Sequence, residues 1–247
     1  GAAPLSKTVG TFFACVGFQI QEAYGQTECT GVSNINRADR LKFGSVGPNL
    51  PGVEVKIAED GEILVRGDGV FLGYFNAPED TAKAMVDGWL CTGDIGEFDE
   101  EGHLRITDRK KDIIVTAGGK NVAPQNLENM LKPYRGISQV VVIGDKRKFL
   151  SALVTLDYDE MAQALDEHLP SLEACTSHPS VLAKIQSYID AVNAELASYE
   201  TIKKFQVLER DFTIDDGELT PTLKIKRRVV QKQYESLIDG MYQEKFE

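Results

Sequence analysis

The chain has 247 residues, of which 42% are hydrophobic, so it can form one large domain or two modest ones. A formal net charge of -11 argues against a nucleic-acid partner and disfavours a generally anionic membrane surface. The four cysteines and three histidines show no zinc-type spacing. Because the cysteines are scattered along the chain, we expect reduced thiols in a cytoplasmic protein. The sequence predicts no signal peptide and no membrane span, although peripheral contact with a membrane stays open.

Short elements separated by tight turns are predicted over the first hundred residues. Residues 6–17 read as a helix between a Ser6 cap and Gly17, and Asn76 is expected to cap a second helix that begins at Pro78. Asp60-Gly61 is a hairpin signal. Strands are predicted at 19–24, 53–57, 62–66, 89–90, 95–98 and 103–106. So many short strands predict a distorted β-barrel or a meander.

Five consecutive charged residues, Asp108 to Asp112, follow these strands. Burying them as a block would carry a large desolvation cost, so they are expected to form an exposed connector between two folded units. A solvated turn inside one domain is the alternative.

After this charged run the pattern changes to apolar strands and amphipathic helices. Residues 113–247 are therefore predicted to form an α+β unit with its own core. Gly118-Gly119 marks a turn. Strands are predicted at 113–116, 140–143, 151–156 and 205–208, and helices at 125–131, 158–167, 180–196 and 227–242.

The run Tyr24 to Glu28 follows a predicted strand, at the kind of crevice where sheet proteins place nucleotides. Its aromatic ring could stack on a base, and its carboxylate could hold Mg²⁺. A packing tyrosine followed by a simple helix start explains the same residues.

Asp94 follows a glycine turn and could accept hydrogen bonds from a ribose, or it could be a turn residue. Arg109 could donate hydrogen bonds to the same sugar or to a phosphate, or it could belong to a solvated surface ion pair.

Lys224 lies in a basic stretch, Leu219 to Arg228. A lysine on a loop there suits charge developing on a phosphate or a carboxylate. A basic helix start that touches acidic partners, or an ordinary exposed strand, fits the stretch equally well.

Taken in this order, the segments resemble the adenylate-forming acyl-CoA synthetase superfamily, and within it the long-chain fatty-acid–CoA ligases. The segments that carry the resemblance are residues 1–6, 21–28, 44–47, 89–94, 108–112 and 219–228. Residues 215–224 and the extended helical segment at 158–198 are typical of the long-chain branch.

The resemblance implies a nucleotide site in the first part of the chain. Ala2 and Ala3 would line the adenine and acyl-adenylate pocket, although the family more often has Gly at the first position. Tyr24 would stack on adenine and Thr27 would contact the α-phosphate. Six residues would cradle AMP: Glu22, Ala23, Tyr24, Gly25, Gln26 and Thr27. Glu28 would bind Mg²⁺, and Asp94 and Arg109 would hold the ribose.

The resemblance also implies a mobile second part. Lys224 matches the lysine that bridges the carboxylate and the α-phosphate during adenylation. Leu223 precedes it, where shorter-chain members of the family have Gly. Lys226 is a weaker candidate for the same role. Asp108 and Lys111 would belong to a hinge, and Gly118 and Gly119 would pass the pantetheine of CoA to the acyl-adenylate. The implied domains are residues 1–108 of a large domain, a hinge at 109–112 and a small domain at 113–247.

One family feature, a Gly- and Ser/Thr-rich loop that grips the β- and γ-phosphates, is missing from this sequence. We therefore interpret the chain as the C-terminal part of a long-chain fatty-acid–CoA ligase whose N-terminal part is its missing partner. The ligase would convert ATP and a fatty acid to an acyl-adenylate and then transfer the acyl group to CoA. The chain alone is predicted to be inactive. A fatty acyl-AMP ligase that serves a carrier protein, or a non-catalytic interaction module, are the alternatives.

Overall fold

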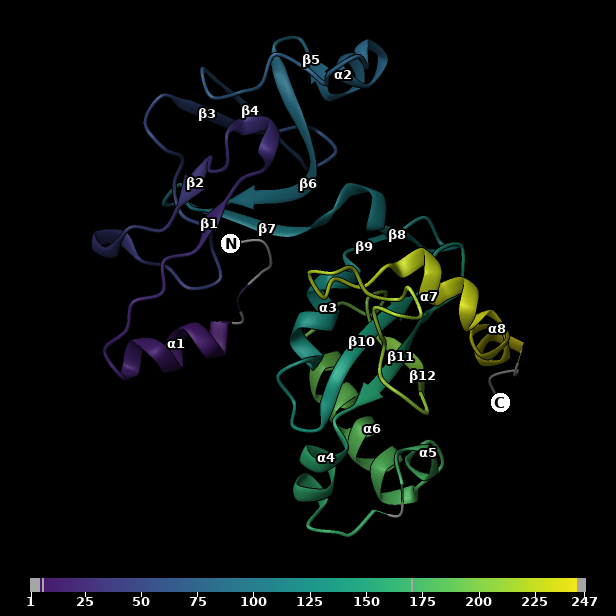
Figure 1. Cartoon of the computed structure of the whole chain (residues 1–247). Coiled ribbons are helices and arrows are strands. Elements are labelled where there is room, and N and C mark those ends of the chain that lie inside the picture. Colours follow the sequence, from purple (N-terminus) through teal and green to yellow (C-terminus); the bar gives the residue numbers. More distant parts are fainter. Residues whose placement is uncertain (1–4, 6, 170, 244–247) are drawn as a thin grey trace. The chain divides into compact units, whose positions relative to one another are not determined.

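The computed structural model describes residue 5, residues 7–169 and residues 171–243, with the side chain of Thr8 excepted. The chain divides into two compact units, Gly1–Asp112 and Ile113–Glu247, and each has its own apolar core. Figure 1 shows the helices and strands of both units. Their combination of sheets and separate helices confirms the predicted α+β class.

An antiparallel sheet forms the centre of the first unit. Its strands lie in the order β3-β4-β6-β5, and β7 also pairs with β6. The elements of the unit are α1 (Lys7–Cys15), β1 (Ala23–Tyr24), η1 (Thr27–Cys29), β2 (Asn34–Ile35), η2 (Ala38–Arg40), β3 (Val53–Ile57), β4 (Glu62–Gly67), α2 (Pro78–Ala84), β5 (Met85–Val86), β6 (Trp89–Phe98), β7 (Leu104–Arg109) and η3 (Lys110–Asp112).

The predicted distorted barrel is wrong, because this sheet is open. Strand β6 pairs with β4 along one edge, and with β5 and β7 in succession along the other. The outer strand β3 pairs with β4, and within the described residues it does not close onto the far edge.

The two strands predicted at 89–90 and 95–98 are a single ten-residue strand, β6. Between the pairs Leu64–Cys91 and Glu62–Ile95, β6 has more residues than β4, so it bulges at Gly93, whose φ is +71°. The Thr-Gly-Asp sequence that was interpreted as a glycine turn therefore marks a bulge inside a strand.

Other boundaries in the first unit also differ from the prediction. The strand expected at 19–24 is reduced to Ala23–Tyr24. The capping position of α2 is held by Ala77 without a side-chain cap, and Asn76 adopts a left-handed φ of +53°. Asp108 lies within β7 and is only 1% exposed, so the charged run is not exposed throughout.

The second unit is a three-stranded sheet covered by helices. Its elements are β8 (Ile114–Val115), β9 (Asn121–Val122), α3 (Pro124–Leu131), β10 (Ile137–Ile143), β11 (Leu150–Leu156), α4 (Tyr158–Leu165), α5 (Leu172–Cys175), α6 (Pro179–Asn193), β12 (Ile202–Val207), α7 (Arg227–Gln233) and α8 (Glu235–Gln243). Central β11 pairs antiparallel with β10 and parallel with β12, and every residue of it is buried.

Alternating residues of β10 enter two cores, as expected for a strand buried on both faces. Val140 and Val142 pack with apolar residues of α3, α4 and α6, whereas Val141 and Ile143 pack with those of α7 and α8. The single helix predicted at 227–242 is broken at Tyr234, and α5 was not predicted. No helix among the described residues is long and apolar enough to span a bilayer.

Candidate functional site

Tyr24 ends strand β1 and is the centre of a buried polar contact. The residue is 8% exposed, and its hydroxyl donates to Asp94 Oδ2 over 2.8 Å. Burial, with the Asp94 carboxylate as a second cause, raises the pKa of the Tyr24 phenol. Tyr24 therefore remains a neutral donor that fixes one oxygen of Asp94.

The other oxygen of Asp94 faces Arg109. The two residues are register partners on β6 and β7, and Arg109 Nε lies 3.2 Å from Asp94 Oδ1. Asp94 is 8% exposed, whereas the Arg109 side chain is half exposed. An ionised carboxylate offers about four lone-pair sites, so Asp94 keeps acceptor capacity for further hydroxyl donors.

Glu62 holds the bulge that carries Asp94. Its Oε1 accepts from the Gly93 amide at 2.8 Å, and its Oε2 lies 2.7 Å from Lys110 Nζ. The ammonium of Lys110 is also 2.6 Å from Asp60. Hydrogen bonds to Asp60 and Glu62 raise the pKa of Lys110. The Glu62 carboxylate thus connects Gly93, which precedes Asp94, to Lys110, which follows Arg109.

A cavity of about 510 Å³ lies in front of these groups. Its lining residues are Gln26, Glu28, Tyr74, Leu90, Cys91, Thr92, Gly93, Arg109, Lys110 and Lys111. A neighbouring hollow of about 550 Å³ is lined by Tyr74 and the surface of α2, without a comparable set of converging polar groups. The first cavity combines acidic, basic and aromatic side chains and is the better candidate site.

Glu28 is the acidic group on the cavity wall. It lies in η1, and its Oε1 accepts from the Tyr74 hydroxyl at 2.8 Å. Mg²⁺ is commonly held by one or two carboxylates together with substrate phosphates and water. A single half-buried carboxylate facing a cavity fits such an ion.

The remaining predicted residues of the first unit are divided between the cavity and its surroundings. Gln26 lines the cavity, whereas Glu22 accepts from the Leu5 amide at 3.2 Å, and burial raises its pKa. Thr27 is exposed in η1. A Cβ on Gly25 would lie 1.9 Å from the Gly31 carbonyl oxygen, which explains the glycine. Ala2 and Ala3 lie outside the described residues.

Sequence reasoning missed Glu62, Tyr74 and Lys110. Glu62 reads as an ordinary strand residue, and only the register of β4 against the bulge reveals its contact with Gly93. Tyr74 is distant in sequence from Glu28. Lys110 was placed in the exposed run, yet it is tied to two carboxylates of the first unit.

Glu62→Ala is expected to destabilise the chain by about 1–3 kcal/mol, because the Gly93 amide loses its acceptor in a partly buried site. Denaturant unfolding measures the change. Glu54→Ala is the matched control, since Glu54 lies on the paired strand β3 and forms an exposed ion pair with Arg66. Surface pairs contribute about 0–1 kcal/mol. Equal losses in the two variants would contradict the role given to Glu62.

Lys224 belongs to the second unit and lies on an exposed turn. The Thr220 amide donates to the Lys224 carbonyl at 2.8 Å, and the Lys224 amide donates to Thr220 Oγ1 at 3.0 Å. Leu223 adopts a φ of +59° and is 66% exposed. The segment is therefore a tight turn that presents the lysine, and not the exposed strand that was one alternative for this stretch. Gly118 and Gly119 form the exposed turn between β8 and β9.

Leu223→Gly is expected to raise the free energy of unfolding by up to about 1 kcal/mol. A left-handed conformation costs an L-residue roughly 1–2 kcal/mol, and part of the gain is lost to the greater freedom of unfolded glycine. Leu223→Ala removes the apolar side chain but keeps the strained backbone, so it separates the two effects. Thermal or denaturant unfolding of all three chains gives the answer, and stabilisation by alanine equal to that by glycine would rule out backbone strain.

Two family models match the chain. Residues 1–75 match the AMP-binding enzyme model, and residues 111–246 match the AMP-binding enzyme C-terminal domain. The chain therefore belongs to the family of AMP-binding enzymes.

Curated relatives include long-chain-fatty-acid–CoA ligases. The chain is 44% identical over 246 residues to FadD15 of Mycobacterium bovis, across 98% of this chain and 41% of that protein. It is 37% identical over 271 residues to ACSBG2 of Xenopus laevis, across 99% of this chain and 37% of that protein. The chain thus spans about two fifths of the length of these relatives.

Solved structures of similar fold include the O-succinylbenzoate coenzyme A synthetase of Bacillus subtilis in complex with AMP. The TM-score is 0.71 at 27% identity, covering 92% of this chain and 44% of that one. The adenylation domain of a Mycobacterium chelonae carboxylate reductase gives a TM-score of 0.79 at 24% identity, across 99% of this chain and 38% of that one. The second likeness concerns the fold alone.

Proposed function

We propose that the chain forms part of an AMP-forming long-chain fatty-acid–CoA ligase. The observation that carries the proposal is the contact of Tyr24 and Arg109 with the two oxygens of Asp94, beside the cavity that contains Glu28. Such a buried, oriented carboxylate next to a cationic donor suits a ribose diol. The 44% identity to a long-chain-fatty-acid–CoA ligase supports the substrate class.

In this proposal the first unit binds the nucleotide. Asp94 accepts from the ribose hydroxyls and Arg109 donates to the sugar, while Tyr24 packs against adenine. Thr27, exposed in η1, donates to the α-phosphate. Glu28 would hold Mg²⁺, and the ion would neutralise phosphate charge.

The second unit supplies the groups that differ between two half-reactions. During adenylation, Lys224 places its ammonium where the fatty-acid carboxylate meets the α-phosphate and stabilises the developing charge. During thioester formation, Gly118 and Gly119 face the acyl-adenylate and admit the pantetheine thiol of CoA. Rotation about Asp108 and Lys111 exchanges the two sets of groups.

AMP release tests the proposed function. The chain alone and the full-length polypeptide that contains it are each given ATP, Mg²⁺, palmitate and CoA. We expect release from the full-length protein and none from the chain, because the sequence lacks the loop that grips the β- and γ-phosphates. A full-length protein that forms no palmitoyl-CoA would overturn the proposal, and AMP release by the chain would overturn the assigned need for that loop.

A further inference from the structure

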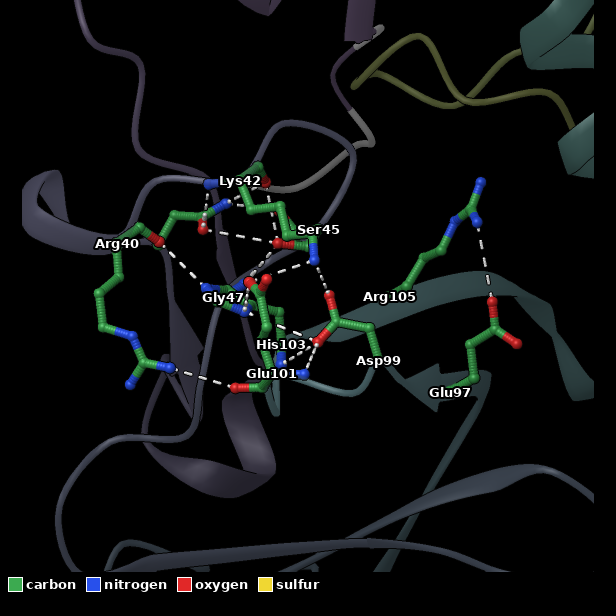
Figure 2. A network of polar contacts seen from close by, with 10 residues as sticks. Arg40, Lys42, Ser45, Gly47, Glu97, Asp99, Glu101, His103 and Arg105 are labelled. Atoms are coloured by element: carbon green, nitrogen blue, oxygen red, sulfur yellow. Dashed lines mark hydrogen bonds and ion pairs between the residues drawn. The ribbon is translucent and has the colours of Figure 1, made fainter.

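A polar cluster outside the cavity occupies the turn between β6 and β7. Asp99 begins the turn, and its Oδ1 accepts from the amides of Glu101 and His103, each at 2.9 Å. Figure 2 shows Asp99, Glu101 and His103 gathered beside Lys42. One ligand-type atom from each of Asp99, Glu101 and His103 lies within 4.8 Å of the others. The function proposed above makes no use of this cluster.

His103 points an unsatisfied nitrogen into the cluster. Its side chain is 3% exposed, and Nε2 lies 3.0 Å from the carbonyl oxygen of Arg40. A carbonyl only accepts, so Nε2 carries the proton and a neutral ring has its lone pair on Nδ1. Nδ1 is buried, and among the described residues it has no hydrogen-bond partner. It faces Asp99 Oδ1 at 3.7 Å and Glu101 Oε2 at 3.8 Å.

These separations suit a shared cation better than a direct hydrogen bond. A charge-assisted N–H···O bond is about 2.7–2.9 Å long, well below the observed values. Two ligands each about 2.1 Å from a tetrahedral ion lie roughly 3.4 Å apart, so small movements would complete a site. An imidazole nitrogen beside carboxylates favours a zinc-like ion over Mg²⁺ or Ca²⁺.

Lys42 already partly balances the two carboxylates. Its Nζ lies 2.7 Å from Asp99 Oδ2 and 3.3 Å from Glu101 Oε2. One ammonium against two carboxylates leaves one negative charge among these three side chains, and the Arg40 guanidinium donates to the Glu101 carbonyl. The side chain of Lys42 is 43% exposed, so its ammonium would be solvated after displacement by an ion. Lys42 is thus a competitor that a divalent ion would displace.

We propose that Asp99, Glu101 and His103 bind one divalent transition cation of the zinc class, which joins the β6–β7 turn at His103 Nδ1. The ion displaces the Lys42 ammonium and completes its coordination with water. Because His103 also contacts the Arg40 carbonyl, the ion stabilises the packing of that segment on the turn.

The test is a Zn²⁺ titration of the 247-residue chain, first stripped with chelator, using calorimetry and a competing chelator. We expect one saturable equivalent, weakened at least tenfold by Glu101→Gln. The matched control is Glu100→Gln, which neutralises the adjacent exposed acid and should change affinity less than twofold. Lys42→Met should tighten binding several-fold, the opposite of its effect if Lys42 merely supported the fold.

Histidine NMR identifies the ligand. The chain has only three histidines, so the Nδ1 resonance of His103 can be distinguished from those of His168 and His178. Zinc is expected to shift His103 Nδ1 in the wild type and not in Glu101→Gln at the same concentration. Absence of binding in both the wild type and Lys42→Met would overturn the proposal, as would a shift confined to the other histidines.

Discussion

Replacing Lys224 by alanine in the full-length protein is expected to slow acyl-adenylate formation by about 10²–10³-fold, the usual loss when one group that stabilises developing charge is removed. Thioester formation from supplied acyl-adenylate should change little, because Lys224 serves only the first step in the proposed scheme. Single-turnover measurements of each half-reaction separate the two rates.

Lys226→Ala is the matched control for this experiment. Lys226 is an exposed lysine two residues further along the same stretch, and its amide donates to the Glu218 carbonyl through the backbone, which the substitution keeps. We expect adenylation by this variant to stay within a few-fold of the parent. Equal loss of both half-reactions in Lys224→Ala would remove Lys224 from its assigned role.

Glu218→Ala is expected to have the largest effect on stability, about 3 kcal/mol. Glu218 is fully buried, and its carboxylate pairs with Arg210 through contacts of 2.7 and 3.0 Å. It also accepts from the Thr213 amide at 2.9 Å and the Tyr234 hydroxyl at 3.1 Å. Breaking a buried pair on one side leaves its donors without a partner, which costs about 3–5 kcal/mol; partial exposure of Arg210 places the expectation at the low end.

Asp216→Asn controls for the loss of charge near Arg210. Asp216 contacts the same guanidinium at 3.3 Å, but its side chain is half exposed. The change should therefore cost under about 1 kcal/mol. Urea unfolding of both variants is the measurement. A Glu218→Ala loss no greater than that of Asp216→Asn would mean that the buried network contributes nothing specific.

Local signals in the sequence predicted most elements, but not how far strands extend. The Asp60-Gly61 turn and the amphipathic pattern of α6 are short-range features, and both appear where expected. The sequence prediction divided β6 into two strands, because a glycine at a bulge cannot be told from a glycine at a turn without knowledge of the paired strand. The open sheet and the break at Tyr234 likewise depend on tertiary contacts.

Motifs in the sequence pointed to Asp94 and Arg109 as neighbours, whereas residues that act through backbone contacts carried no signal. Asp94 and Arg109 were paired in the sequence interpretation, and they are register partners in the structure. Glu62 belongs to no motif and acts through the Gly93 amide. Asp108 was grouped with its charged neighbours, although alternation along β7 turns it into the buried face. Backbone register, which the sequence does not display, decides both cases.

The break between α7 and α8 has a consequence for C-terminal truncation, proteolysis and tagging of the protein. Tyr234 stands at this break and donates to Glu218, while Ile238 and Met241 of α8 pack into the core shared with Leu219. The turn that carries Lys224 is therefore braced by residues that follow it in the chain. A product cut before Tyr234 would retain Lys224 and every residue proposed to touch substrate, yet it would lose the brace. Activity after proteolysis or C-terminal tagging should accordingly be judged by whether α8 still docks.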